Sequence, residues 1–179
     1  MGRVFAPRLQ QRIPSMRTVY VVAVSFLLAS AAHAAGSSSK AFLDKAIEGN
    51  YAEIKMGQLA QQNAQSDDVK KYGQMLSDDH SAANQKAIEA AKSMGVNPPD
   101  GPSAKQKAEY DRMSKLNGAK FDRMFAMHMV ADHEKDIAEY KKEAKRSDAA
   151  ADYAKGEVDV LEKHLDAAKS LSSKKTSSR

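Results

Sequence analysis

The chain has 179 residues, 42% of them hydrophobic and 6% aromatic, and it contains neither cysteine nor tryptophan. This length allows one domain with a buried core, and the lack of cysteine excludes disulfides, thiolate chemistry and lipid attachment at a cysteine. The formal net charge of +5 belongs mostly to residues 1–34, which contain four arginines and no acid. The remainder is nearly neutral and has no basic face with interleaved aromatic residues, so no nucleic-acid partner is expected.

Residues 1–34 have the three parts of a secretory signal peptide. A basic segment precedes an apolar run at residues 19–28 (VYVVAVSFLL), and a small-x-small cleavage motif follows at residues 32–34. The alternative is an uncleaved membrane anchor, but the apolar run is short for a span of about 20 residues. The sequence therefore predicts export to the periplasm and no membrane span in the mature chain. Translation could start at Met1 or Met16, because residues 16–34 form a complete signal alone.

The rest of the chain shows the apolar periodicity of amphipathic helices and no run with the period of a strand. Residues 35–40 (AGSSSK) are predicted to be a flexible lead, and residues 172–179 a disordered basic tail. Between them, residues 41–171 form the predicted domain. Its long helices are expected at about 40–65, 67–94, 121–144 and 148–171.

The connections between these helices predict the topology. Ser66 and Ser147 are expected N-caps directly after a preceding helix, so the first two and the last two helices are antiparallel neighbours. The middle connection is long, and Ser103 with Gln106 forms a capping box for a short extra helix. An all-α, ferritin-like four-helix bundle with one long crossover is the predicted fold. An up-down-up-down bundle with a decorated loop is the alternative.

Each long helix places a side chain that can bind metal inside its apolar stripe, at a similar depth. These candidate ligands are Glu53, His80, His133 and His164. A mixed imidazole and carboxylate set suits a transition metal such as Fe, Zn or Cu. Candidate carboxylates for a surrounding shell are Asp79, Asp132 and Glu157.

The pattern departs from the di-iron sites of ferritin-like bundles, which use Glu-x-x-His on two helices. Ser77, Val130 and Leu161 stand three residues before the histidines, so ferroxidase chemistry is not expected. The histidines and Glu53 could instead form a buried polar network that fixes helix register. They could also bind a small ligand or sense pH. No hydrolase motif is present.

Four segments together resemble the exported bacterial family called domain of unknown function 4142. The segments are FLDKAIEGNYAEIKMGQLA, VKKYGQMLSDDHSAANQKAIEAAKSMG, GAKFDRMFAMHMVADHEKDIAEYKKEA and VLEKHLDAAKSL. The resemblance implies a periplasmic ferritin-like bundle and no particular activity. Members are often labelled outer-membrane proteins, for which this sequence offers no support.

Three functions remain open on the sequence. The first is a non-enzymatic envelope or stress-related protein that binds a metal ion or a protein partner, self-association included. The second is a metal-dependent redox or storage protein. The third is a structural or interaction module with a buried His–carboxylate network.

Overall fold

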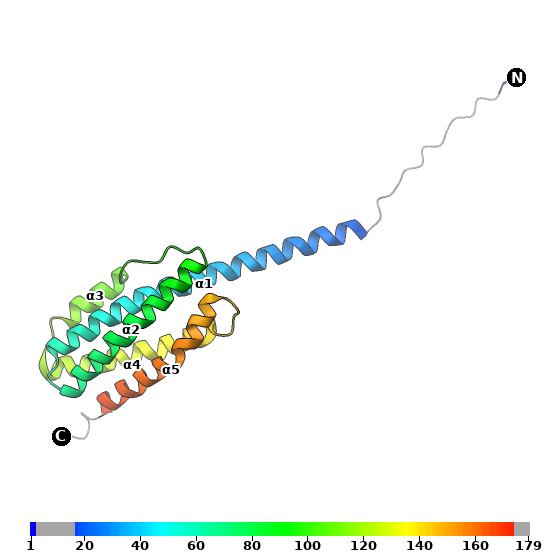
Figure 1. Cartoon of the computed structure of the whole chain (residues 1–179). Coiled ribbons are helices and arrows are strands. Elements are labelled where there is room, and N and C mark those ends of the chain that lie inside the picture. Colours follow the sequence, from blue (N-terminus) through cyan, green and yellow to red (C-terminus); the bar gives the residue numbers. More distant parts are fainter. Residues whose placement is uncertain (3–16, 174–179) are drawn as a thin grey trace. The chain divides into compact units, whose positions relative to one another are not determined.

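The computed structural model describes the backbone of residues 1–2 and 17–173, and the side chains of residues 1–2 and 38–173. The described part contains five helices and no strand (Figure 1). These are α1 (Arg17–Asn63), α2 (Asp67–Ser93), α3 (Ala104–Met113), α4 (Gly118–Glu143) and α5 (Ala149–Ser173). Residues 1–36 and 37–179 separate into two units, and the second is the helical domain considered below.

Most of the predicted signal peptide lies outside the described side chains, as do residues 174–179 of the predicted tail. Within the described residues, no helix has the length and apolar character needed to cross a membrane.

The start of the domain differs from expectation, because residues 35–40 are helical and belong to α1 rather than to a flexible lead. Ser39 is fully buried. Its Oγ lies 2.8 Å from Glu143 Oε1 and 2.6 Å from Asp148 Oδ2. Residues 35–40 therefore continue the helix. The hydroxyl of Ser39 is hydrogen-bonded to Glu143 at the end of α4 and to Asp148 just before α5.

Two of the three expected caps differ in detail. The capping box of Ser103 and Gln106 is present at the start of α3, as predicted. Ser66 makes no side-chain cap, and the carboxylate of Asp122 instead accepts hydrogen bonds from backbone N–H groups of residues 65 and 66. At α5 the cap is Asp148 rather than Ser147, since Asp148 Oδ1 accepts from the backbone N–H of Ala151 at 3.0 Å.

Two contacts of α1 fix the helix directions. Ser39, near the middle of α1, meets the end of α4 at Glu143. The end of α1 meets the connection to α4, because Asn63 Nδ2 donates to the carbonyl of Leu116 at 2.8 Å. Helix α1 is thus antiparallel to α4 and, through a short link, to α2. Helices α2 and α4 consequently run in the same direction, which the long connection carrying α3 makes possible (Figure 1).

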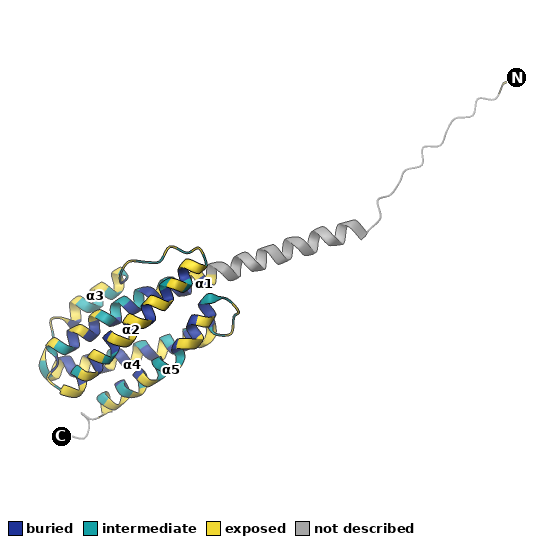
Figure 2. Ribbon diagram, in the orientation of Figure 1, coloured by how far each residue is buried: buried dark blue, intermediate teal, exposed yellow. Residues whose placement is uncertain are grey.

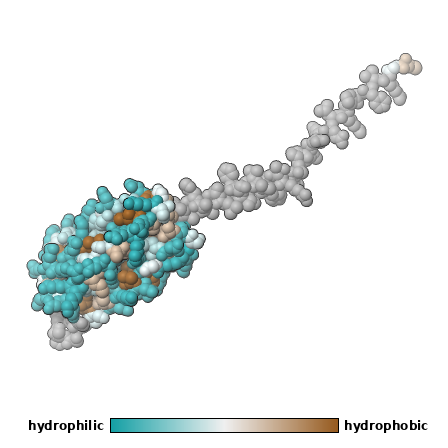
Figure 3. Space-filling view, viewed as in Figure 1, coloured by the Kyte–Doolittle hydropathy of each residue, from teal (hydrophilic) through white to brown (hydrophobic). Residues whose placement is uncertain are grey.

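The buried hydrophobic side chains form two clusters, one toward each end of the domain. Figure 2 shows how buried and exposed positions alternate along the helices. The first cluster includes Phe42, Leu43, Ile47, Tyr140, Tyr153 and Leu161. The second includes Met56, Leu76, Phe121, Phe125 and Met129. On all four long helices, buried polar residues lie between the two sets: Asn50, Glu53, His80, His133 and His164. A polar layer therefore crosses the middle of the core. The face in Figure 3 is mainly hydrophilic.

Helices α1 and α2 approach one another backbone to backbone close to this layer. A Cβ atom on Gly73 would lie 2.6 Å from the carbonyl oxygen of Gly57, and one on Gly57 would collide with the carbonyl oxygen of Gly73. Ser77 Oγ also donates to the carbonyl of Ile54 at 3.2 Å. The missing side chains thus let α2 bring His80 close to α1.

Candidate metal centre

Three histidines meet in the polar layer, and each comes from a different helix. His80 lies on α2, His133 on α4 and His164 on α5, and all three are buried. Their ring centroids are 5.2 to 5.9 Å apart. One ring nitrogen of each lies within 4.8 Å of the corresponding nitrogens of the other two. We call this set the histidine trio.

Oxygen acceptors fix which nitrogen of each imidazole carries the proton. His80 Nδ1 lies 2.9 Å from Asn50 Oδ1, and His133 Nδ1 lies 3.0 Å from the carbonyl of Met129. His164 Nε2 lies 2.9 Å from Asp79 Oδ2. Carbonyl and carboxylate oxygens only accept, so each of these nitrogens is the N–H donor. The opposite nitrogen of each neutral ring then carries a lone pair.

The inner nitrogens, opposite those that contact oxygen, are His80 Nε2, His133 Nε2 and His164 Nδ1. His133 Nε2 and His164 Nδ1 are 3.3 Å apart, and His80 Nε2 is buried with no hydrogen-bond partner. Two lone pairs at this distance repel unless a proton or a cation lies between them. The outer acceptors match the usual surroundings of metal-bound histidine, whose second nitrogen donates to a carboxylate or carbonyl.

Burial keeps two of these rings neutral. It holds the pKa of His80 well below its usual value, and the neighbouring His133 and His164 lower it further. Burial likewise lowers the pKa of His133 to about 4, and His164 adds to the effect. At neutral pH both imidazoles therefore offer lone pairs rather than protons, which is the state that metal binding requires.

The spacing suits a four-coordinate ion after a small movement. With metal–nitrogen bonds of about 2.1 Å and tetrahedral angles, ligand nitrogens lie about 3.4 Å apart. The 3.3 Å separation between His133 and His164 already fits. A pair of nitrogens at the 4.8 Å limit would have to move closer by roughly 1.4 Å.

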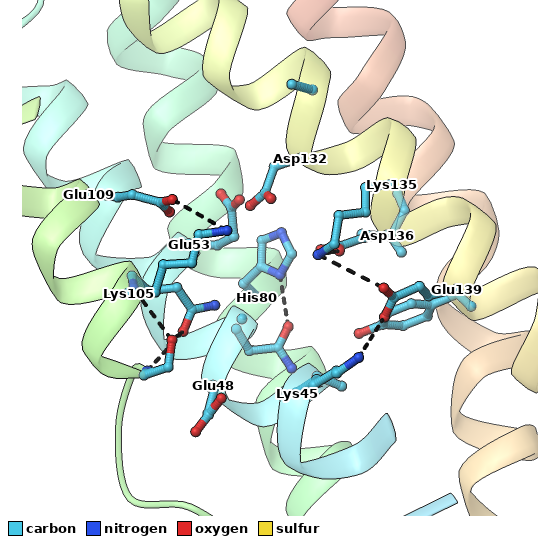
Figure 4. Close-up of a pocket in the computed structure, with 18 of the residues that line it drawn as sticks. Lys45, Glu48, Glu53, His80, Lys105, Glu109, Asp132, Lys135, Asp136 and Glu139 are labelled. Carbon is cyan, nitrogen blue, oxygen red and sulfur yellow. Dashed lines mark hydrogen bonds and ion pairs between the residues drawn. The ribbon is translucent and has the colours of Figure 1, made fainter. Parts of the chain in front are cut away.

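A pocket of about 490 Å³ borders the trio at His80. Figure 4 shows the ring of His80 inside it, with the carboxylates of Glu53 and Asp132 beside one another. Glu53 is 4% exposed and its Oε2 has no hydrogen-bond partner. Burial raises its pKa well above the usual value, and the nearby acids Asp132 and Asp136 raise it further.

A family model described as a domain of unknown function, DUF4142, matches residues 26–171. The chain belongs to this family. The predicted resemblance to DUF4142 is thus confirmed over most of the chain. No curated protein and no solved structure matches the sequence.

Against this DUF4142 background, the structure brings together three of the four predicted ligands. Glu53 is not part of the trio and instead contacts Asp132 across α1 and α4. Of the predicted outer carboxylates, Asp79 contacts His164, while Glu157 pairs with Lys86 at 2.8 Å.

Asn50 is a residue of the site that the sequence did not single out. It orients His80, and its Nδ2 donates to the hydroxyl of Tyr153 at 3.1 Å. The available signal was an amide inside the apolar stripe, one turn before Glu53. Asp136 was also missed, although it lies one turn after Asp132 and lines the same pocket.

Proposed function

We propose that this protein binds one transition metal ion through His80, His133 and His164. The observation that carries the proposal is geometric: one ring nitrogen of each buried histidine lies within 4.8 Å of those of the other two, and the opposite nitrogens contact Asn50, the carbonyl of Met129 and Asp79. Imidazole ligands suit Zn, Cu and Fe. A fully satisfied register-setting network would also give His80 Nε2 a hydrogen-bond partner, and it has none.

Nearby carboxylates support a cation in this layer. Imidazole ligands do not offset the charge of the ion they bind, so a divalent ion would bring two positive charges into the core. Asp79 contacts the outer nitrogen of His164, and Glu53 and Asp132 border the pocket beside His80. These acids lower the electrostatic cost of the ion.

The setting we propose is an exported, periplasmic ferritin-like bundle with a binding rather than a catalytic role. The parallel directions of α2 and α4 and the long crossover between them support the ferritin-like arrangement. The basic, apolar and small-residue segments of residues 1–34 support export. Mass spectrometry of the protein recovered from the periplasm tests this, with a mature N-terminus near Ala35 as the expected result.

Metal content of the untagged protein is the direct test. We expect about one Zn²⁺ or Co²⁺ per chain, with the intense visible absorption of tetrahedral Co²⁺, and a rise in melting temperature on loading. His133→Ala should reduce the affinity at least tenfold, because it removes a ligand. His128→Ala is the matched control on the same helix, and it should bind as the wild type does.

A second variant separates ligation from folding. Asp79→Asn keeps the shape of the contact with His164 but removes the carboxylate. It should therefore lower the affinity for the ion about 10- to 100-fold. Unchanged Zn²⁺ affinity in both the His133 and Asp79 variants would overturn the proposal. The same holds if wild-type protein takes up no ion and the His133 variant is simply less stable, in which case the trio is structural.

A further inference from the structure

A second pocket, of about 350 Å³, is lined mainly by methionine. Four of the chain's nine methionines line it, and they come from three helices. Met56 lies on α1, Met113 on α3, and Met124 and Met127 lie on α4. His128 adds an imidazole to the same wall. None of these five residues belongs to the histidine trio.

Hydrophobic packing explains two of these methionines but not the other two. Met56 and Met113 are buried and belong to the second hydrophobic cluster. Met124 and Met127 are 39% and 56% exposed, and among the large hydrophobic side chains described in residues 37–179 they are the two exposed ones. A single exposed hydrophobic residue needs no explanation. Two of them beside one methionine-lined pocket indicate a role for their thioether groups beyond packing.

The spacing on α4 brings three of the possible ligands to one face of the helix. Met124, Met127 and His128 stand at positions i, i+3 and i+4, where side chains are neighbours with Cβ atoms about 5–6 Å apart. A methionine side chain has three rotatable bonds, so its sulfur can move to a ligand while the backbone stays in place. The two buried methionines line the same space from α1 and α3. The pocket therefore gathers thioether and imidazole groups from three helices.

The charge of this pocket suits a monovalent ion better than a divalent one. Thioether groups are uncharged, and of the described residues that line the pocket only Glu109 carries a carboxylate. That carboxylate lies 3.9 Å from Lys105 and 3.9 Å from Arg112, so it leaves no surplus negative charge to offset a second positive charge. Cu(I) carries one charge, and soft thioether ligands select it over harder divalent ions.

We infer that this methionine-lined pocket binds one Cu(I) ion, separate from the ion at the histidine trio. Met124, Met127 and His128 receive the ion at the surface, and the sulfurs of Met56 and Met113 complete its coordination from below. The inference goes beyond the proposed function and holds whether or not the trio binds an ion.

Anaerobic titration with Cu(I), in competition with a chromophoric Cu(I) chelator, tests the site on untagged protein. Leucine keeps the size and apolar character of methionine but lacks the sulfur. We therefore expect the double variant Met124→Leu, Met127→Leu to lose roughly tenfold or more in Cu(I) affinity. Met75→Leu is the matched control, because Met75 is a partly buried methionine that does not line the pocket. Circular dichroism and thermal melting establish that each variant is folded.

X-ray absorption spectroscopy of the copper-loaded protein identifies the ligand atoms without any variant. The chain contains no cysteine, so a sulfur ligand of copper can only be methionine. Sulfur neighbours are the expected result, and copper surrounded by nitrogen and oxygen alone would overturn the inference. No Cu(I) uptake against the chelator, or equal affinity in the wild type and the double variant, would also overturn it.

The inference and the proposed function can fail separately. Copper bound to sulfur should persist in His133→Ala, which removes a ligand of the trio. Zn²⁺ binding should be unchanged in the double methionine variant. Loss of copper–sulfur contacts in His133→Ala would show a single shared centre and contradict a separate Cu(I) site.

Discussion

At the scale of single residues, Glu53 has an unfavourable environment for a charged group in the metal-free protein. Its carboxyl group is buried against two other acids, and its folded pKa is raised well above the ordinary value of 4.5. Folding therefore favours its protonated form. Its contribution to stability is complete below pH 4.5 and is lost as the pH rises through the folded pKa.

Glu53→Gln should remove this loss in the metal-free protein. The amide keeps the size and hydrogen-bonding capacity of the protonated acid and carries no charge. We expect the variant to be about 1–3 kcal/mol more stable than wild type at pH 7, and the difference to vanish below pH 4.5. Urea unfolding across this pH range in the presence of chelator measures it. A Gln variant that is less stable at pH 7 would show that Glu53 is ionised and compensated.

Residue-level prediction from the sequence was best for the histidines. Helical periodicity placed His80, His133 and His164 inside their stripes, and counting from the helix starts placed them at one depth. The same counting could not assign Glu53, because depth along α1 does not specify whether its carboxylate faces the imidazoles or α4. The partners of the outer nitrogens, such as Asn50, depend on side-chain rotamers and contacts between helices, which a single sequence does not encode locally.

At the scale of elements, the Gly57–Gly73 contact sets the distance between α1 and α2. A three-residue link makes these helices neighbours, but only the missing side chains let their backbones touch. The sequence showed both glycines as isolated residues inside helical patterns, where glycine is unfavourable by about 1 kcal/mol relative to alanine. Their role depends on the close approach of α1 and α2, which the sequence of either helix alone does not indicate.

Gly73→Ala should therefore destabilise the protein despite alanine's higher helix propensity. The new methyl group would press against backbone of α1, which cannot move aside as a flexible side chain can. We expect a loss of about 1–3 kcal/mol in the free energy of unfolding, and weaker Zn²⁺ binding because His80 moves away from Asn50. Denaturant unfolding and a metal titration measure the two effects.

Gly156→Ala is the matched control for this prediction. Gly156 lies on α5, where an added Cβ would meet nothing within 4 Å. This variant should gain up to about 1 kcal/mol from helix propensity and bind Zn²⁺ normally. Similar losses in both variants would show that the close contact has no special role.

At the scale of the whole molecule, the core is divided into two hydrophobic clusters by one polar layer. The all-α fold and the connection lengths followed from the sequence, because long periodic segments and Gly- and Pro-containing breaks are local signals. The helical state of residues 35–40 did not follow from the sequence, because the helix around Ser39 is stabilised by acids more than 100 positions away. The division of the core into two clusters could not be predicted either, because it depends on how the apolar faces of the four long helices pack against one another.

The trio joins α2, α4 and α5, while α1 supplies only an amide that orients one ring. An ion held by three imidazoles would act as a cross-link between those three helices. Local opening of α2, α4 or α5 would then have to break a metal–nitrogen bond, whereas α1 could still open without breaking one. Hydrogen exchange should consequently slow on Zn²⁺ loading in the first three helices and least in α1. Of the four long helices, α1 would therefore be the one that opens most easily in the loaded protein.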